Sequence, residues 1–501
     1  MKRDEKRDKM SKTNNIIRKI TNWKIIITIQ LIASIALVGI LFKLSILPTL
    51  YIVIVIAILL MFVLISYFLT KPSKTMNKEG LKKFFGKILS LLFSVILLIG
   101  TLYAAQGDSV INSITGANQQ VTRFSVIVMK NSEYQSLSDL KNNFVELCET
   151  YDSNEDINKA MDALNKKEST ISVKKVSDYS SLADDLYDGK TNAIFVNESY
   201  NGLFEEKHPA FDSETRIIWS FDIVEKMNDI SKEVNVTKDV FNIYISGIDT
   251  SGPVSTVSRS DVNMLVTVNP KTKQILMTSI PRDYYVTLDN ISQKDKLTHA
   301  GLGGVENSVK TIENFMDIDI NYYARVNFTS LITMVDALGG IDVYSDLTFT
   351  PWTNSGIAIH EGINHMNGEM ALAFARERYA YKSGDNHRVQ NQQAVLAAML
   401  DKAMSPAIIT NYSKILKSIE GCFETNMASK DITALIQMQL SDMAKWNIMQ
   451  IQLSGSGTMM TGGALMPNNR LYYMIPDQSS VDRASDLIKR MDSGETISID
   501  E

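Results

Sequence analysis

Three long hydrophobic stretches open the chain, at residues 25–42, 44–69 and 88–105. Each is close to or above the roughly 18–20 residues that a helix needs to cross the hydrocarbon core of a membrane. A single stretch would also fit a buried core helix or the apolar part of a signal peptide. Three in succession, with no small-residue cleavage site after the first, favour membrane spans. The pattern therefore predicts three transmembrane helices within residues 25–105.

The charged residues beside these stretches predict the orientation of the chain. Residues 1–24 contain nine Lys or Arg, residues 70–87 contain six Lys, and the loop between the first two stretches contains only Lys43. Short flanks rich in Lys and Arg stay in the cytoplasm. We expect a multi-pass protein of the cell membrane with a cytoplasmic tail at 1–24, and everything after about residue 105 outside the cell.

After the membrane part, the pattern changes to short alternating strands and helices. Residues 106–120 are rich in Gly, Ser, Asn and Gln, which is typical of a linker. Strands are expected at 124–129, 171–176 and 193–196, and helices at 137–148 and 180–187. Either Ser136 or Ser138 is the expected N-cap of the first helix. The pattern predicts a linker and small α/β accessory domain within 106–227, in which we identify no catalytic constellation.

A second and longer α/β pattern follows a polar boundary near residue 228. Strands are expected at 241–247, 263–268, 274–280, 341–344 and 448–453. Helices are expected at 305–315, 328–338, 368–375, 386–404, 431–446 and 480–491. No clear linker interrupts this region, so we predict one large domain over 228–491 and a short tail at 492–501.

The composition restricts the classes of function. The chain has 501 residues, of which 45% are hydrophobic and 21% charged, with a formal net charge of −5. Because the basic residues concentrate before residue 88, the remainder carries an acidic excess. This excess argues against nucleic acid as a partner, since its binding depends on neutralising phosphates. Cys148 and Cys422 provide neither a disulfide framework nor a metal-type cysteine cluster.

Two carboxylates follow or precede predicted strands. Asp249 lies in the segment GIDTSG directly after the strand at 241–247, and Asp261 lies in SRSD just before the next strand. If both carboxylates lie at the same end of adjacent strands, they could share a divalent cation such as Mg²⁺. The alternative is that both are turn or cap residues, a common role for Asp.

Arginines recur in the same region. Arg282 follows a buried strand and a proline in IPRD, although a surface arginine in a turn is the better explanation of this motif taken alone. Arg376, Arg378 and Arg388 lie within thirteen residues. On a continuing helix, Arg376 and Arg378 would point about 200° apart. They would converge more easily if the helix ended near Ala375, or if only one of them contacted the ligand.

A helix start next to these arginines suits an anionic ligand. Gly384 and Asp385 are expected to begin the next helix, with Asp385 as N-cap. Arg388 and Gln392 would then share one helical face, and the N-terminus of a helix favours an anion. Guanidinium groups beside such a terminus fit a phosphate or pyrophosphate. The alternative is a solvated segment in which Glu377 and Asp385 pair with the arginines.

These segments, taken in order, closely resemble the LytR-CpsA-Psr family of Gram-positive cell-envelope proteins. The motifs are YISGIDT, SRSDVNMLVTV, SIPRD, DKLTHA, NFTSLITMVDALGGIDV, ALAFARERY and GDNHRVQNQQAVL. The resemblance covers residues 241 to roughly 490. Three spans, an accessory domain and then this domain also resemble the capsule-locus (CpsA-type) members of the family. The resemblance implies a mixed sheet flanked by helices, with an apolar pocket for a prenyl chain.

The resemblance also implies a reaction outside the membrane. Such proteins are phosphotransferases that move a glycopolymer, such as a capsular polysaccharide or exopolysaccharide, from polyprenyl pyrophosphate to a peptidoglycan hydroxyl. Carried over by motif, Asp249 and Asp261 would hold Mg²⁺, and Asp385 would be the base. The pyrophosphate contacts would come from Arg259, Arg282, Arg376, Arg378 and Arg388, with Gln392 beside them. Many members have Arg where this chain has Asn391, so one basic contact is missing from the pattern.

Three other interpretations remain open at this stage. One is a membrane-anchored regulator of polysaccharide synthesis or transcription, for which the short cytoplasmic segments offer little surface. Another is a module that binds lipid-linked phosphate without reacting, and the third is a pyrophosphatase that uses water as acceptor. The expected partners are the lipid-linked polysaccharide, peptidoglycan and the membrane, and capsule-synthesis membrane proteins are a further candidate.

Overall fold

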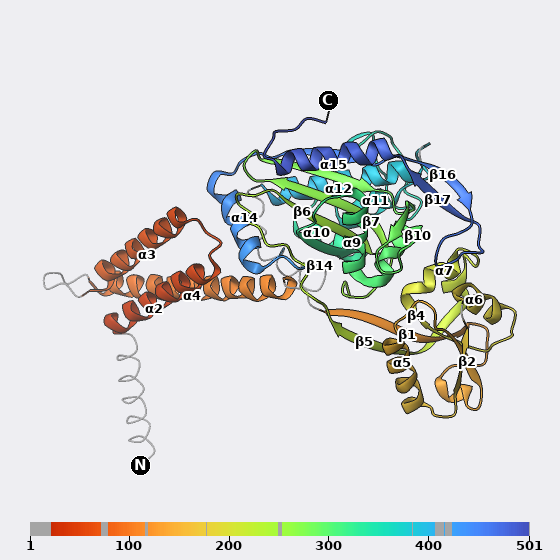
Figure 1. The fold of residues 1–501 in the computed structure, drawn as a ribbon. Coiled ribbons are helices and arrows are strands. Elements are labelled where there is room, and N and C mark those ends of the chain that lie inside the picture. The colour runs from red at the N-terminus through yellow and green to blue at the C-terminus, as the bar shows by residue number, and fades with distance from the viewer. Residues whose placement is uncertain are drawn as a thin grey trace, which may run out of the picture. The chain divides into compact units, whose positions relative to one another are not determined.

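The computed structural model describes residues 22–71, 79–115, 119–176, 178–248, 253–382, 384–405, 415 and 423–499. The chain forms two compact units. The first unit comprises Met1–Asn112 with Ser429–Met443, and the second comprises Ser113–Ala428 with Ala444–Glu501. Figure 1 shows the fold of both.

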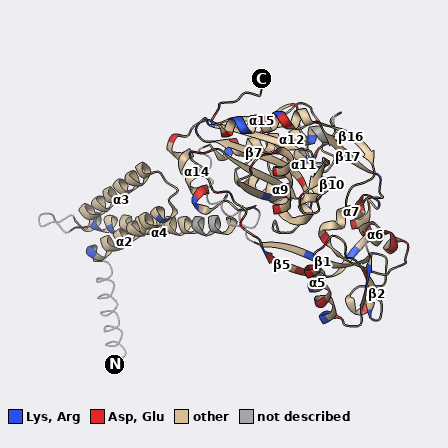
Figure 2. Cartoon of the chain, viewed as in Figure 1, with Lys and Arg blue, Asp and Glu red and all other residues tan. Residues whose placement is uncertain are grey.

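The first unit contains the membrane anchor. Within the described part of the chain, three helices are long and apolar enough to cross a membrane: α2 (Trp23–Leu44), α3 (Thr49–Thr70) and α4 (Glu79–Ile114). Figure 2 shows these helices with few charged residues along most of their length. Ser90 donates a hydrogen bond to the buried Gln30, which links α4 to α2. The predicted spans are therefore confirmed as helices of the expected length.

One expectation next to the anchor is wrong. Residues 106–120 were expected to form a linker, but α4 continues to Ile114 and strand β1 (Gln119–Met129) begins soon afterwards. Helix α14 (Ser429–Asp442) also belongs to the first unit, where Gln437 donates a hydrogen bond to the backbone oxygen of Leu47. The predicted helix at 431–446 is thus present but ends earlier.

The accessory region is built on a mixed sheet in the order β3-β2-β4-β1-β5. Its strands are β1, β2 (Phe144–Cys148), β3 (Ser172–Val176), β4 (Ile194–Asn197) and β5 (Thr215–Lys226). Helices α5 (Asn154–Lys167) and α6 (Tyr179–Tyr187) cover opposite faces, as Figure 1 shows. The chain continues through η2 (Glu198–Tyr200), α7 (Asn201–Glu205) and α8 (Phe211–Glu214). The predicted α/β class is confirmed.

One prediction for this region, a helix at 137–148, is wrong. Only Leu137–Leu140 is helical, as the 3₁₀ turn η1, and its N-cap is Ser136. Asn142 then adopts a positive φ of 61°, which ends the turn, and Phe144–Cys148 forms the buried strand β2. A 3.6-residue spacing of apolar side chains arose here because a short turn is followed by a buried strand.

The second and larger sheet of the unit is also mixed, in the order β14-β11-β6-β7-β8-β15. Its strands are β6 (Phe241–Ile248), β7 (Ser260–Asn269), β8 (Gln274–Ile280), β11 (Tyr322–Asn327), β14 (Phe423–Thr425) and β15 (Asn447–Gln452). The central strands β6, β7 and β8 pair antiparallel, whereas β11 runs parallel to β6 and β15 parallel to β8. This is the mixed sheet with flanking helices that the family resemblance implies.

Helices cover both faces of this sheet. One face packs on η3 (Leu297–Gly303), α9 (Gly304–Met316) and α15 (Gln478–Asp492), through a core that includes Tyr244, Leu265 and Ile312. The other face meets α10 (Phe328–Ala337), α11 (Gly368–Arg376) and α12 (Asp385–Ala403). Because side chains alternate along a strand, neighbours of Tyr244 and Leu265 face this second set of helices.

Three hairpins complete the described part of the second unit: β9 (Tyr285–Leu288) with β10 (Gln293–Lys296), β12 (Ile341–Ser345) with β13 (Gly362–Met366), and β16 (Gly455–Met460) with β17 (Leu471–Pro476). The sequence indicates β12 but not the other hairpin strands, which are short and lack a clear alternation. Cys148 is buried, and Cys422 lies outside the described residues.

Candidate diphosphate and lipid site

A cavity of about 590 Å³ lies between the large sheet and helices α10, α11 and α12. The sheet contributes Ile245, Gly247, Val262 and Met264, which alternate with the core residues of the opposite face. The helices contribute the apolar side chains of Leu331, Met334, Leu338, Leu372, Leu396 and Met399. The interior of the cavity is therefore suited to a hydrocarbon chain.

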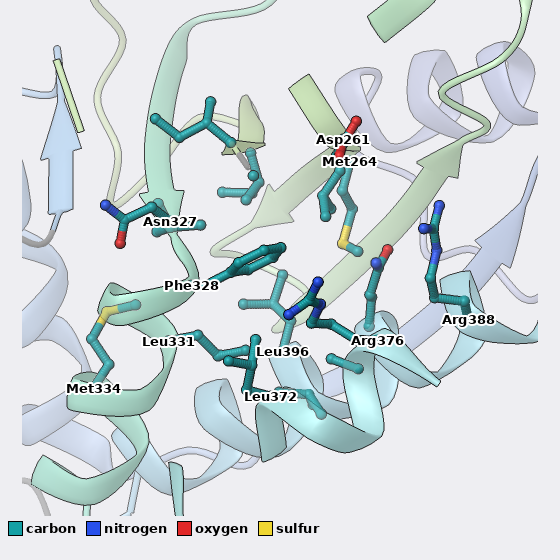
Figure 3. Close-up of a pocket in the computed structure, with 18 of the residues that line it drawn as sticks. Asp261, Met264, Asn327, Phe328, Leu331, Met334, Leu372, Arg376, Arg388 and Leu396 are labelled. Atoms are coloured by element: carbon teal, nitrogen blue, oxygen red, sulfur yellow. The ribbon is translucent and has the colours of Figure 1, made fainter. Parts of the chain in front are cut away.

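Charged groups gather at one end of this cavity. Arg259, Asp261, Arg282, Arg376, Arg378 and Arg388 all line it. Figure 3 shows Asp261 and Arg388 on one side of the cavity, and Leu331 and Met334 on the other. The cavity thus joins an apolar interior to a cationic end.

Asp261 lies in the middle of the charged group. Its Oδ1 is 3.0 Å from Nη1 of Arg282 and 3.3 Å from Oγ1 of Thr298. Burial alone would raise the pKa of Asp261, but the charges of Arg282, Arg259 and Arg388 outweigh it and hold the pKa below its usual value. Asp261 is therefore ionised at neutral pH, and its electrostatic partners are three of the five arginines named in the sequence analysis.

The end of helix α11 explains how Arg376 and Arg378 share the site. The helix stops at Arg376, and Glu377 has extended backbone angles of φ −69° and ψ 131°. Glu377 is buried and accepts hydrogen bonds from the backbone N–H groups of Trp352, Tyr379 and Ala380 at 2.7–2.9 Å. Arg376 and Arg378, on either side of it, both line the cavity. The helix thus ends where the first of the two alternatives requires, and whether both arginines contact one ligand stays a prediction.

Helix α12 presents one face to the cavity. Arg388, Gln392, Val395, Leu396 and Met399 line it at helical spacing. The N-cap of this helix is Gly384, with φ 54°, and not Asp385, which is its first residue. Glycine fits this position because other residues rarely adopt a positive φ.

Asn391 does not face the cavity. Its side chain is buried and donates a hydrogen bond to the backbone oxygen of Phe374 at 3.0 Å, which ties α12 to α11. The residue that departs from the family pattern therefore packs between two helices, while Gln392 beside it lines the cavity.

The accessory region contributes a third wall. Gly202, Glu205 and Glu206, in and after α7, line the charged end. Nη1 of Arg259 donates a hydrogen bond to the backbone oxygen of Gly202 at 3.3 Å, and its Nη2 lies 3.9 Å from Glu205. Glu206 pairs with Lys296 at 2.7 Å. The two carboxylates at the end of α7 thus lie near Arg259, which directly precedes β7, and Lys296, which ends β10.

Sequence reasoning missed these accessory residues and also Trp352 and Phe328. Glu205 and Glu206 carry no periodic or motif signal, since a pair of glutamates usually marks a solvated surface. Asp249, the other predicted metal ligand, lies outside the described residues, as does the side chain of Asp385. The structure therefore brings together the arginines, Asp261 and Gln392, and the roles of Asp249 and Asp385 stay predictions.

Comparison with known proteins identifies the family of this chain. A family model described as the LytR_cpsA_psr family matches residues 215–490, more than half of the chain. A second model, described as a DNA polymerase processivity factor, matches residues 78–196, less than a quarter of the chain, and the matched segment includes a membrane-length helix. The chain belongs to the LytR_cpsA_psr family.

Relatives carry names from cell-wall assembly. A protein of Bacillus anthracis named polyisoprenyl-teichoic acid–peptidoglycan teichoic acid transferase TagU is 34% identical over 261 residues, which are 52% of this chain and 82% of the relative. The protein of the same name from Enterococcus faecalis is 33% identical over 246 residues, 48% and 79% of the two chains.

Solved structures give matches of similar extent. One is described as TagT bound to LI-WTA, with 30% identity, a TM-score of 0.44 and coverage of 53% of this chain and 96% of the other. Another is the protein gbs0355 from Streptococcus agalactiae, with 28% identity, a TM-score of 0.45 and coverage of 54% and 93%.

Proposed function

We propose that this protein is a membrane-anchored phosphotransferase that moves a glycopolymer from a polyprenyl diphosphate carrier to a hydroxyl group of peptidoglycan. The observation that supports it most is the joining of an apolar cavity of about 590 Å³ to a group of five arginines. A prenyl diphosphate has the same two-part character. The names of the relatives, which are transferases of teichoic acid to peptidoglycan, support the same chemistry.

In this proposal the arginines hold the diphosphate and neutralise the charge that spreads over its oxygens. Phosphoryl transfer depends mainly on positioning and on charge stabilisation. The acceptor oxygen forms a bond to the phosphorus that carries the glycopolymer, and the bond from that phosphorus to the bridging oxygen breaks. Polyprenyl phosphate leaves, and the hydroxyl proton passes to a base, for which we propose Asp385. The glycopolymer is then joined to peptidoglycan through a phosphodiester.

Mg²⁺ is the cofactor that we propose for this site. Mg²⁺ in phosphate sites takes one or two carboxylates together with substrate oxygens and water. Asp261 is ionised and lines the charged end, so it fits as one such ligand, with Asp249 as the second. When bound, the ion would add positive charge next to the diphosphate.

We further propose that the large domain acts outside the cell, with residues 1–24 in the cytoplasm, because the basic residues flank the spans on that side. The anchor then keeps the site close to a lipid-borne donor. We propose a capsular polysaccharide or exopolysaccharide as the polymer, since the order of spans, accessory domain and large domain resembles the capsule-locus members. Transfer assays of the same preparation, with one donor that carries teichoic acid and one that carries capsular polymer, will show which polymer the protein transfers.

The test uses the full chain in nanodiscs with a lipid-linked glycopolymer, Mg²⁺ and purified peptidoglycan. Two products are measured: sugar bound covalently to peptidoglycan, and polyprenyl monophosphate. We expect Arg376→Ala and Arg388→Ala to lower both at least tenfold, because each removes a charge-assisted contact worth roughly 1.5–3 kcal/mol. Arg123→Ala is the matched control, since Arg123 pairs with Asp222 on the accessory sheet and does not line the cavity.

Each alternative gives a different outcome. Monophosphate without attached sugar would indicate a pyrophosphatase, and binding without either product would indicate a lipid-phosphate module. A regulator would lose function when residues 1–20 are removed, whereas the transferase should keep polymer attachment. Unchanged products in both arginine variants would contradict the proposed site.

A further inference from the structure

Two aromatic side chains lie exposed beside the charged end of the cavity. Trp352 lines the cavity with 49% of its surface exposed, and Tyr379 is 65% exposed. Their ring centroids are 5.4 Å apart, and the ring planes are nearly perpendicular at 89°. Large apolar rings normally lower the free energy of a protein by being buried, so two exposed rings held against each other require another explanation.

The surrounding backbone fixes both rings. The buried carboxylate of Glu377 accepts hydrogen bonds from the backbone N–H groups of Trp352 and Tyr379, at 2.9 Å and 2.7 Å. In addition, Nε1 of Trp352 donates to the backbone oxygen of Arg376 at 3.2 Å. The segment that presents Arg376 and Arg378 to the cavity therefore also holds the rings, so the four side chains form one preorganised unit.

Aromatic rings and guanidinium groups alternate along this unit. The guanidinium carbon Cζ of Arg376 lies 4.4 Å from the ring centroid of Phe328 and 6.0 Å from that of Trp352. Arg378 lies 5.7 Å from the ring of Trp352 and 5.1 Å from that of Tyr379. All four distances fall within the range of cation–π attraction. The order runs from Phe328, which lines the cavity, to the exposed Tyr379.

This order gives the site a direction. Phe328, 4.4 Å from Arg376, belongs to the lining of the cavity, whereas Trp352 and Tyr379 are 49% and 65% exposed to solvent. If the arginines hold a diphosphate whose prenyl chain enters the cavity, the group on the opposite end of the diphosphate extends toward Trp352 and Tyr379. In the proposed donor, that group is a sugar.

We propose that Trp352 and Tyr379 form a stacking subsite for the first sugar of the donor, the one bonded directly to the diphosphate. This inference rests on the proposed function. A pyranose ring has apolar C–H faces and a polar rim, so an aromatic face covers the former and the neighbouring guanidinium groups donate hydrogen bonds to the latter. Trp and Tyr also lose little conformational entropy on binding, because each has two side-chain torsions.

The test measures binding of two defined lipids to the full chain in nanodiscs. One probe is polyprenyl diphosphate, and the other is the same lipid bearing a single N-acetylglucosamine on its diphosphate. Wild type should bind the sugar-bearing lipid more tightly. Trp352→Leu and Tyr379→Leu should each weaken that binding about tenfold, the order of one good stacking contact, and change binding of the bare lipid less than about twofold.

Two further variants separate stacking from structural effects. Trp352→Phe keeps a ring face but loses the indole N–H, so it should retain most of the affinity for the sugar-bearing lipid. Tyr344→Leu is the matched control, because Tyr344 is 57% exposed on β12 and does not line the cavity. It should bind both lipids as wild type does.

Several outcomes would overturn the subsite. Equal losses for both lipids would show that the rings only position the arginines, and unchanged binding would show that no sugar is stacked. Normal donor binding with a raised KM for peptidoglycan would assign the rings to the acceptor. If wild type binds neither lipid, the proposed function fails instead, which keeps the two failures distinguishable.

Discussion

Asp261 and Arg282 form a partly buried ion pair at the charged end of the cavity, with Oδ1 and Nη1 3.0 Å apart and side chains that are 15% and 25% exposed. The pair leaves two roles for Asp261, and they predict opposite effects of its removal. A carboxylate that binds Mg²⁺ strengthens diphosphate binding through the ion. A carboxylate that only neutralises Arg282 weakens binding of an anion.

We therefore expect Asp261→Asn to lower the affinity for polyprenyl diphosphate at least about tenfold in the presence of Mg²⁺, and to abolish its response to EDTA. Asp283→Asn is the matched control, because Asp283 lies 3.6 Å from Nε of Arg282 but does not line the cavity. Titration of the lipid with and without Mg²⁺ makes the measurement. Tighter binding in Asp261→Asn would assign the carboxylate to charge balance alone.

The apolar part of the cavity makes a separate prediction. Leu396→Trp adds a large ring to the cavity-facing side of α12. We expect at least tenfold weaker binding of a long-chain polyprenyl diphosphate, because overfilling a packed space displaces its contents. Dimethylallyl diphosphate, whose short chain needs little of the cavity, should bind unchanged.

The control for this prediction is Gln390→Trp, since Gln390 is exposed on the same helix. It should bind both diphosphates normally. Equal loss of the long and the short diphosphate in Leu396→Trp would indicate that the substitution disturbs the arginines, and would remove the evidence that the cavity holds the prenyl chain.

Much of this architecture could be predicted from sequence because local patterns determine it. The three spans follow from length and hydrophobicity. Arg376 and Arg378 both line the cavity because α11 ends at Arg376, where Glu377 accepts hydrogen bonds from nearby backbone N–H groups and from that of the distant Trp352. The end of the helix was foreseeable as a condition, but the burial of Glu377 was not, since a glutamate between two arginines looks like a solvated ion pair.

The contributions that sequence could not reveal come from distant parts of the chain. Glu205 and Glu206 reach the cavity because Leu203 of the accessory region shares a buried apolar cluster with Leu302 of η3 and Tyr473 of β17. The residues of such a cluster are hydrophobic in any arrangement, so their pattern does not identify their partners. The exposed Trp352 likewise could not be assigned to the site from sequence, because its proximity to Arg376, Arg378 and Tyr379 depends on the fold.

A substitution at the contact between Gly202 and Arg259 tests whether the accessory region affects the site. A Cβ atom at Gly202 would overlap the guanidinium group of Arg259, which is the flexible end of a side chain and can move away. We expect Gly202→Ala to preserve the melting temperature and to lower polymer transfer about five- to tenfold, through the displaced arginine.

A double-mutant cycle gives the control. In an Arg259→Ala background, Gly202→Ala should cause no further loss of transfer, because the group it displaces is already absent. Two losses that simply multiply would show that Gly202 acts by another route, such as a changed packing of α7.

The raised pKa of Asp152 predicts how the stability of the accessory region depends on pH. Burial raises the pKa of Asp152 to about 6, although hydrogen bonds from Tyr179 and Asn197 partly oppose the shift. A carboxyl whose pKa is raised in the folded state binds more protons there than in the unfolded chain. The resulting stabilisation is fully present below pH 3.8, the ordinary value, and is lost as the pH rises through about 6.

Hydrogen exchange of the amides in β4 and α6, recorded from pH 4 to pH 7.5 and corrected for intrinsic rates, measures this effect locally. We expect their opening free energy to fall by up to roughly 3 kcal/mol over that range. Asp152→Asn keeps an oxygen for Asn197 but cannot ionise, so its profile should be much flatter. Asp188→Asn, on an exposed residue that pairs with Lys190, should retain the wild-type slope. An unchanged slope in Asp152→Asn would mean that another group produces it and that Asp152 of the wild type does not titrate in this range.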